Sequence, residues 1–185
     1  MKRGPFEVLK SEKIYQSRWI KVRKDQIVYP AGWRGNYTVV ELKGGAGVVS
    51  INEKGEIYLV GQYRYAPNIY SWEIPKGSLT RLKDPNILET AKQELKEETG
   101  LTASHWKKLT TVHTLLGSTN DKVHLFLATG LQQGIANPEK TEADIQTQKV
   151  SWRKFYKMVE DGEITDATSI AAVLLTKLRY PDKLK

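Results

Sequence analysis

The sequence predicts an α+β fold, in which strands build a layered sheet and helices cover its faces. Runs of β-rich composition dominate the first half of the chain. The apolar residues change to helical spacing between about residues 85 and 99, and strands then resume. Two further helical segments close the chain, so strands, one helix, more strands and terminal helices follow one another in that order.

The N-terminal part of the chain has the composition of antiparallel strands. Residues 13–15 and 19–28 form a predicted hairpin bent at residues 16–17. A Pro-Ala-Gly segment at residues 30–32 ends the second of these strands. The next predicted strands cover residues 37–42, 47–51 and 57–63, and a hairpin turn at residues 52–55 is expected to join the last two.

A helix over residues 85–99 is the clearest single element. Asp84 is the predicted N-cap, and Pro85 follows in the first turn, where its missing N–H costs nothing. Gly100 stands where the left-handed residue that ends a helix is expected. Apolar residues recur at helical spacing as its buried face: Ile87, Leu88, Ala91 and Leu95.

The rest of the chain returns to strands and then ends in helices. The first predicted terminal helix, residues 153–160, stops at Asp161 and Gly162. The second, residues 167–178, has Asp166 as its predicted cap. The strands expected before them cover residues 106–113, 123–129 and 147–152.

Composition limits the classes of protein to consider. The 185 residues are 39% hydrophobic and 27% charged, which is typical of a globular chain. The sequence has no cysteine, which excludes a thiol nucleophile, a cysteine zinc site and a disulfide framework. No apolar run approaches the ~20 residues of a membrane span, and the N-terminus lacks the apolar core of a signal peptide. We therefore expect a cytoplasmic protein with no membrane partner.

The formal net charge of +8 raises the question of a nucleic-acid partner. The basic residues are spread along the chain, and their densest groups are short. A solvated surface explains this distribution, and a basic surface would also attract a small anionic diphosphate. Nucleic acid is therefore not the expected partner.

Three carboxylates near the end of the central helix carry the chemical argument. Glu94, Glu97 and Glu98 stand at positions i, i+3 and i+4, which places them on one helical face. Like charges at this spacing repel, and the helix C-terminal end disfavours anions. A hard divalent cation would relieve the repulsion, since Mg²⁺ prefers oxygen ligands. The alternative is an ordinary acidic helix facing solvent.

The segments around these carboxylates resemble the Nudix hydrolase family. Residues 73–77, Glu-Ile-Pro-Lys-Gly, lead through a loop to E-L-x-E-E-x-G-L at residues 94–101, which is similar to the Nudix box. Residues 62–64, 123–128 and 162–167 are similar to the branch that hydrolyses ADP-ribose and nucleoside diphosphate sugars. The resemblance covers most of the chain. It implies an α/β/α sandwich of mixed sheet and helices, together with a small N-terminal antiparallel sheet.

The resemblance also implies a division of the chain and an assembly. Residues 1–42 would form an N-terminal strand region used for dimerisation, and residues 43–185 the Nudix hydrolase domain. Relatives of this branch pack or exchange such strands across a two-fold axis. A homodimer is therefore expected.

Three positions depart from the family pattern. The arginine that normally precedes the first glutamate of the box is Gln93, so a guanidinium partner for the carboxylates is missing. The interval from the glycine to the helix is two residues longer than usual, through residues 80–83. Leu116 stands where relatives that prefer ADP-ribose carry a proline, which favours nucleoside diphosphate sugars in general.

The family pattern assigns roles to individual residues. Glu94 and Glu98 are implied direct ligands of Mg²⁺ (Mn²⁺ is the alternative ion), with the backbone carbonyl of Lys76 completing the inner shell. Glu97 is implied as a third ligand, a bridge through water or a catalytic group. Glu142, in an acidic loop well past the box, is the predicted general base or an additional metal ligand, and Glu139 is the second choice. The alternative is an ordinary solvated acidic loop.

Substrate contacts follow from the same resemblance. Arg64 resembles the arginine that meets substrate phosphate or ribose, with an ordinary surface arginine as the alternative, and Glu73, at the start of the glycine loop, is a further predicted substrate-binding residue. Trp19 falls where relatives place an aromatic side chain against the base. Packing in the core or across a dimer is an equally good use for Trp19.

The expected function is metal-dependent hydrolysis of the diphosphate bond of ADP-ribose or nucleoside diphosphate sugars, giving a nucleoside monophosphate and a sugar phosphate. Two alternatives remain open. One is a pyrophosphohydrolase for RNA 5′ ends or dinucleoside polyphosphates, which the positive charge favours. The other is a non-catalytic Nudix-like module that senses a nucleotide.

Overall fold

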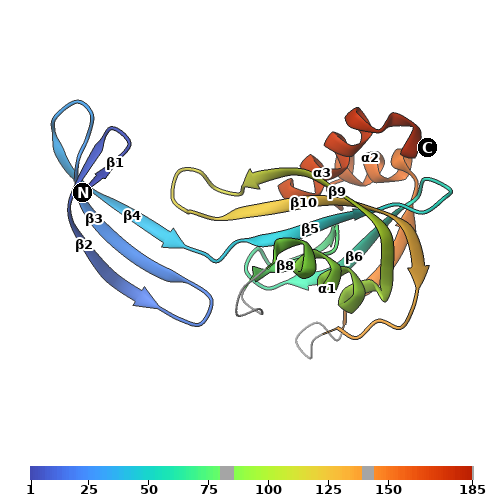
Figure 1. Cartoon of the computed structure of the whole chain (residues 1–185). Coiled ribbons are helices and arrows are strands. Elements are labelled where there is room, and N and C mark those ends of the chain that lie inside the picture. The colour runs from blue at the N-terminus through green and yellow to red at the C-terminus, as the bar shows by residue number, and fades with distance from the viewer. Residues whose placement is uncertain (80–85, 139–143, 185) are drawn as a thin grey trace. The chain divides into compact units, whose positions relative to one another are not determined.

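The computed structural model describes residues 1–79, 86–138 and 144–184 (Figure 1). The chain forms two compact units. The first consists of Met1–Gly44 with His113–Lys122, and the second of Gly45–Val112 with Val123–Lys185. The predicted residues Asp84, Pro85, Glu139 and Glu142 lie outside the described segments.

The first unit is an antiparallel sheet in the order β1-β2-β3-β4. Its strands are β1 (Lys2–Arg3), β2 (Phe6–Gln16), β3 (Lys21–Val28) and β4 (Arg34–Glu41). The predicted hairpin is confirmed, although β2 begins earlier than expected and β3 begins two residues later. Its bend is stabilised by the Ser17 hydroxyl, which accepts hydrogen bonds from the backbone N–H groups of Trp19 and Ile20.

A cluster of charged and polar side chains connects three strands of this unit, β2, β3 and β4. The Arg23 guanidinium donates to Asp25 on the same strand and, at 2.6 Å from Nε, to Glu41 on β4. Asp25 also accepts a hydrogen bond from Ser11 on β2, at 2.6 Å. Burial raises the pKa of Asp25, but the hydrogen bonds from Ser11 and Arg23 outweigh it and hold that pKa below its ordinary value.

The second unit contains two sheets. One is a mixed sheet in the order β8-β5-β10-β9, in which β5 pairs in parallel with β10 and antiparallel with β8. The other is antiparallel, in the order β11-β6-β7. The strands are β5 (Gly45–Ser50), β6 (Ile57–Arg64), β7 (Ile69–Glu73), β8 (Lys76–Ser78), β9 (Leu101–His113), β10 (Lys122–Gln133) and β11 (Gln146–Val150).

The hairpin turn predicted at residues 52–55 is confirmed, but the strands on either side of it do not continue as a paired ladder. The turn chemistry is present, since Asn52 Oδ1 accepts hydrogen bonds from the N–H groups of Lys54 and Glu56. Only one antiparallel bridge, Ile51↔Ile57, follows from it. The two strands then separate into different sheets, because β5 pairs with β8 and β10 while β6 pairs with β7 and β11.

Helices cover both faces of the mixed sheet (Figure 1). They are α1 (Ile87–Thr99), α2 (Trp152–Glu160) and α3 (Ala167–Arg179), and a short 3₁₀ turn follows at Pro181–Lys183. All six residues of β5 are buried, as is typical of a central strand covered on both sides. No helix in the described segments is both long and apolar enough to cross a membrane.

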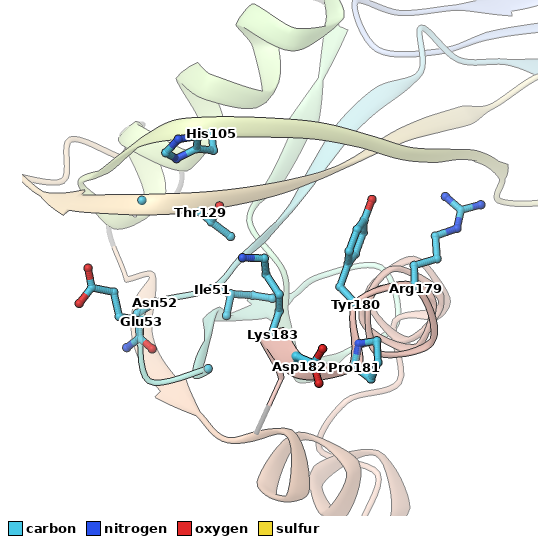
Figure 2. Close-up of a pocket in the computed structure, with 12 residues that line it drawn as sticks. Ile51, Asn52, Glu53, His105, Thr129, Arg179, Tyr180, Pro181, Asp182 and Lys183 are labelled. Carbon is cyan, nitrogen blue, oxygen red and sulfur yellow. The ribbon is translucent and has the colours of Figure 1, made fainter.

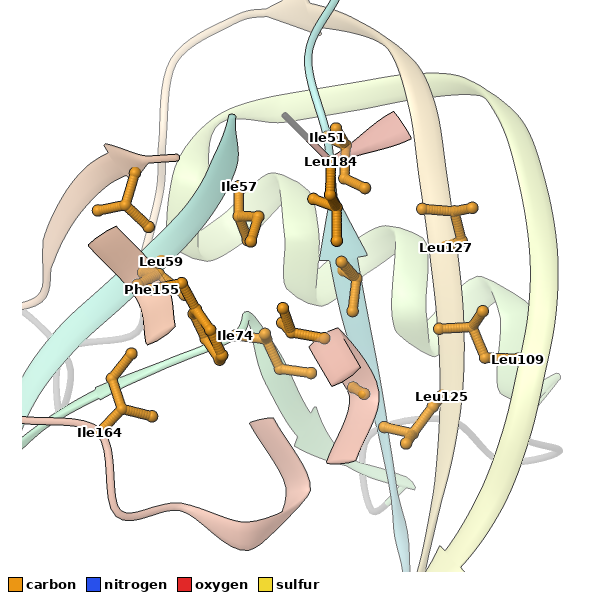
Figure 3. Packing of buried hydrophobic residues seen from close by; sticks show 14 of the residues in the cluster. Ile51, Ile57, Leu59, Ile74, Leu109, Leu125, Leu127, Phe155, Ile164 and Leu184 are labelled. Carbon is orange, nitrogen blue, oxygen red and sulfur yellow. The ribbon is translucent and has the colours of Figure 1, made fainter. Parts of the chain in front are cut away.

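The core is divided by the same sheet into two clusters. Adjacent residues of β10 point to opposite faces, so Leu125 and Leu127 join the larger cluster, whereas Phe126 and Ala128 pack toward α1. Figure 3 shows the larger cluster, which also includes buried residues of α2 and α3. The smaller cluster consists of Ala46, Val48, Ala91, Leu95, Leu101, Phe126 and Ala128.

The central helix begins two residues later than predicted. Asn86 is its N-cap, and its side chain accepts a hydrogen bond from Leu88 N at 3.1 Å. The end is confirmed, since Gly100 has φ of 73° and its N–H donates to Lys96 O. Asp166 is confirmed as the cap of α3, where it accepts from Ser169 N.

Several elements are longer than predicted or were missed. β9 begins at residue 101 and β10 extends to residue 133. The strands β1, β7 and β8 and the 3₁₀ turn were not predicted. β8 has three residues, too few for a compositional signal, but it supplies the glycine loop of the candidate site.

The two left-handed glycines that end helices should differ in their tolerance of alanine. Gly162→Ala places a Cβ in open space at φ +76°, so only the backbone strain of roughly 1–2 kcal/mol is expected. Gly100→Ala adds contacts of 2.7 Å with backbone atoms of Ala136 and Gly134, so its loss of unfolding free energy should be greater. Urea denaturation of both variants measures the difference. Equal losses would contradict the close packing at Gly100.

Candidate active site

The glycine loop is held in place by the edge of the mixed sheet. Lys76 pairs with Gly47 of β5, and Val48 N donates a hydrogen bond to Pro75 O at 2.9 Å. β8 also packs against α1. The loop backbone is therefore fixed between a central strand and the C-terminal half of the carboxylate helix.

The first glutamate of the helix lies directly against this loop. Glu94 is 1% exposed. A Cβ added to Gly77 would overlap the carboxyl group of Glu94, so a side chain at position 77 and the observed position of Glu94 exclude each other. The glycine is required because the carboxylate approaches the loop backbone so closely.

The other two glutamates have different surroundings. Glu98 is 2% exposed and accepts a hydrogen bond from the backbone N–H of Lys76 at 3.2 Å. Glu97 is half-buried and accepts from Gln93 Nε2 at 2.9 Å. The residue that replaces the expected arginine thus still donates to a carboxylate of the set. The alternative of a solvent-facing acidic helix is wrong for Glu94 and Glu98, because both are buried.

The candidate ligand atoms are of the kind that a hard divalent cation binds. Three carboxylates and a loop carbonyl offer only oxygen ligands, as Mg²⁺ or Mn²⁺ prefers. Buried carboxylates close together are costly unless a cation compensates them. In the described ranges, however, no three acidic or histidine side chains stand close enough together to hold an ion as they are.

A chain of ion pairs links the start of the loop to the terminal helix. Glu73 is 4% exposed and accepts from Arg64 Nε at 2.8 Å and Arg64 Nη2 at 2.5 Å. Lys76 Nζ lies 3.0 Å from Glu73 Oε2 and 2.7 Å from Asp166 Oδ2. Sequence reasoning missed these roles for the Lys76 side chain and Asp166, because the two positions are far apart in the chain.

The ion pairs keep both acids ionised. Burial raises the pKa of Glu73, but its hydrogen bond to Arg64 and the charges of Lys76 and Arg64 bring the net pKa below its ordinary value. Burial likewise raises the pKa of Asp166, and Lys76 and Ser169 more than reverse the effect. The stabilisation from these pairs is fully present above the ordinary pKa values and is lost as the pH falls through the lowered ones.

The remaining predicted residues are placed as follows. Trp19 belongs to the first unit, where it is exposed and Arg18 lies over its ring at 4.9 Å. The predicted bases Glu142 and Glu139 fall outside the described segments. The predicted roles of Trp19, Glu73 and both bases remain predictions.

A separate cavity of about 660 Å³ lies between the turn after β5 and the C-terminal segment. Figure 2 shows that Lys183, Tyr180 and His105 line it, together with the residues of that turn. No described residue of the predicted site lines this cavity. It is therefore distinct from the carboxylate site.

Comparison with known proteins shows which family the chain belongs to. Residues 41–173 match the NUDIX domain, which is more than half of the chain. The chain belongs to the Nudix family. Residues 6–40 match the nucleoside diphosphate sugar hydrolase N-terminal domain. The two matches together identify a Nudix pyrophosphatase of the ADP-ribose and nucleoside diphosphate sugar class, an enzyme rather than a non-catalytic sensing module.

Individual Nudix relatives agree with this assignment. The chain is 35% identical over 171 residues to the ADP-ribose pyrophosphatase of Mycobacterium tuberculosis, covering 91% of this chain and 82% of the relative. It is 30% identical over 183 residues to the ADP-ribose pyrophosphatase of Bacillus subtilis, covering 97% and 96%. A crystal structure of an ADP compounds hydrolase matches with a TM-score of 0.82 at 18% identity, over 96% of this chain and 95% of that one. The predicted Nudix fold is confirmed, and Nudix hydrolases generally use a divalent metal.

Gly77→Ala should inactivate the enzyme without unfolding it. The new Cβ must displace the Glu94 carboxylate, and misplacement of a catalytic group by about 1 Å can cost about 100-fold in rate. Steady-state kcat/KM, measured beside thermal unfolding, gives both effects. Gly162→Ala is the matched control, since its Cβ meets no atom within 4 Å. A Gly77→Ala enzyme with unchanged kcat/KM would contradict the contact.

Proposed function

We propose that the enzyme hydrolyses the diphosphate bond of nucleoside diphosphate sugars and ADP-ribose with Mg²⁺, releasing a nucleoside monophosphate and a sugar phosphate. The observation that carries the proposal is the burial of Glu94 and Glu98 against the glycine loop. The named relatives support the substrate class, since two of them are ADP-ribose pyrophosphatases.

The carboxylate helix would hold the metal. Glu94 and Glu98 are the proposed direct ligands, and Glu97 is a third ligand or acts through water. The backbone carbonyl of Lys76 completes the set, whatever its side chain does. When bound, a divalent ion neutralises diphosphate charge and makes water a stronger acid. Mn²⁺ is the alternative ion.

A base must take a proton from the attacking water. Glu142 is the proposed base, with Glu139 as the second choice. Glu97 is the described acid best placed to help, because its half-buried carboxylate lies on the same helical face as Glu94 and Glu98. Gln93 Nε2 donates a hydrogen bond to this carboxylate at 2.9 Å.

Arg64 is the proposed contact for substrate phosphate. Glu73 holds its guanidinium with two hydrogen bonds, and the side chain remains 33% exposed. A guanidinium fixed in this way can meet a phosphate with little loss of entropy. Trp19 is proposed to stack against the nucleobase of the substrate.

The substrate preference is proposed to be broad within this class. Leu116 is exposed at the position where relatives that prefer ADP-ribose carry a proline. A leucine there does not impose the turn that proline would. Nucleoside diphosphate sugars in general are therefore the proposed substrates, and ADP-ribose is one of them.

A homodimer in the cytoplasm is the proposed state of the enzyme. The first unit exposes several large apolar side chains, namely Leu9, Ile14, Tyr15 and Trp33. Such a surface is typical of a protein interface. Light scattering after size-exclusion chromatography should give twice the chain mass of 21.0 kDa, and a monomer mass would remove this proposal.

The function is tested by a substrate panel. The panel contains ADP-ribose, several nucleoside diphosphate sugars, diadenosine polyphosphates and 5′-triphosphate RNA, each assayed with Mg²⁺ and with EDTA. Turnover should be highest for the first two classes and should disappear in EDTA, because the proposed mechanism acts through a bound divalent cation. Preference for RNA, with a steep loss of binding in salt, would favour the alternative function. Activity that persists in EDTA would contradict the mechanism.

A further inference from the structure

The side chain of Lys76 forms ion pairs that its proposed role as a backbone-carbonyl ligand does not require. Its ammonium group bridges two acids from different elements, Glu73 at the end of β7 and Asp166 at the start of α3. The side chain is 22% exposed, so water screens these pairs only in part. Its own backbone N–H meanwhile donates to Glu98. One residue thus connects β7, α3 and the carboxylate helix.

The Asp166 carboxylate is held in place by contacts within α3 that do not involve Lys76. Its carboxylate caps α3 by accepting from Ser169 N at 2.9 Å and from Ser169 Oγ at 2.6 Å. The same Ser169 hydroxyl accepts a hydrogen bond from Ile74 N at 2.9 Å. The start of α3 therefore holds the glycine loop both through its backbone and through an ion pair.

The bridge continues to the proposed phosphate contact. Glu73 Oε2 accepts from both Lys76 and Arg64, while Oε1 accepts from Arg64 Nε. Glu73, Glu98 and Asp166 all attract the Arg64 guanidinium. Without the Lys76 charge, the attraction of Glu73 and Asp166 for it would be less offset, and the guanidinium would be drawn toward these acids and away from a bound phosphate.

We propose that Lys76 and Asp166 are positioning residues, which hold the Arg64 guanidinium, through Glu73, in the place where it meets the substrate diphosphate. The same ion pair keeps the loop peptide of Lys76 against Glu98. This inference rests on the proposed function, since it takes Arg64 to be the phosphate contact. It gives the side chain at position 76 a role in substrate affinity that a backbone ligand alone would not need.

Two substitutions remove the ion pair from opposite ends. Lys76→Met removes the charge and keeps most of the length. Asp166→Asn removes the partner charge but keeps a good helix cap, since Asn and Asp are about equal at that position. Lys76→Arg keeps a cation and should restore function. Lys154→Met is the matched control, because Lys154 forms an exposed pair with Glu163 at 3.5 Å.

The test measures the binding of α,β-methylene ADP-ribose by calorimetry and the KM of the preferred substrate. Lys76→Met and Asp166→Asn should each raise Kd and KM about 10-fold, as is usual when a supporting partner is lost. Lys76→Arg and Lys154→Met should stay within about twofold of the wild type. In an Arg64→Ala background, Lys76→Met should add less than about twofold, because the guanidinium that it positions is absent.

The outcomes separate this inference from the proposed function. If the wild type hydrolyses the panel substrates and Lys76→Met leaves Kd and KM unchanged, the inference is wrong and the function stands. A 10-fold effect of Lys76→Met that persists in full in the Arg64→Ala background would also overturn it. If the wild type hydrolyses none of the diphosphates, the proposed function fails first. If Lys76→Met does not fold, Asp166→Asn decides by the same criteria.

Discussion

The close approach of the glycine loop to the carboxylates of α1 is the constraint on which the candidate site depends. Gly77 can have no side chain, because the Glu94 carboxyl group occupies that space. Glu98 is bound at the same place by the backbone N–H of Lys76. Two buried acids therefore lie against the loop backbone, which donates a hydrogen bond to one of them. Carboxylates gathered in this way offer the oxygen ligands that a hard divalent cation prefers, which is the physical reason for proposing a metal site here.

Three parts of the fold hold the glycine loop and α1 close together. The pairing of β8 with β5 holds the loop to the mixed sheet, and the smaller core cluster, with Leu95 and Ala91, holds α1 against the same sheet. The N-terminus of α3 adds a third attachment through Ser169 and Asp166. Because three elements meet at residues 73–78, a small displacement of any one would move the carboxylates, the loop peptide and Arg64 together.

The parts of the site that follow from local signals were predicted from the sequence. The helix, its terminal Gly100 and the spacing of the glutamates all depend on neighbouring residues. The cap was misplaced because Asp84 and Asn86 are both good N-caps and the sequence alone does not rank them. The turn at residues 52–55 forms as expected, but its flanking strands do not continue as a paired ladder, because each strand takes its partners from distant segments.

The parts that were not predicted depend on contacts between distant residues. Burial of Glu94 and Glu98 follows from the position of β8, which is too short to have a compositional signature. The bridge from Lys76 to Asp166 joins two polar residues that resemble any other surface pair in the sequence. Such pairings are set by the tertiary fold, so pattern reasoning could identify the acids but not the ion pairs that position them.

The most direct measurement of the central claim is turnover as a function of Mg²⁺ concentration for Glu98→Gln. This variant removes the buried charge of a proposed ligand and little volume, and Glu89→Gln on the exposed side of the same helix is its control. Glu98→Gln should keep the wild-type unfolding midpoint and lose at least about 100-fold in turnover, since loss of an outer-shell partner alone typically costs about 10–100-fold and a direct ligand should matter more. Glu89→Gln should match the wild type. Unchanged turnover in Glu98→Gln at every Mg²⁺ concentration would contradict a metal-dependent hydrolase built on this helix.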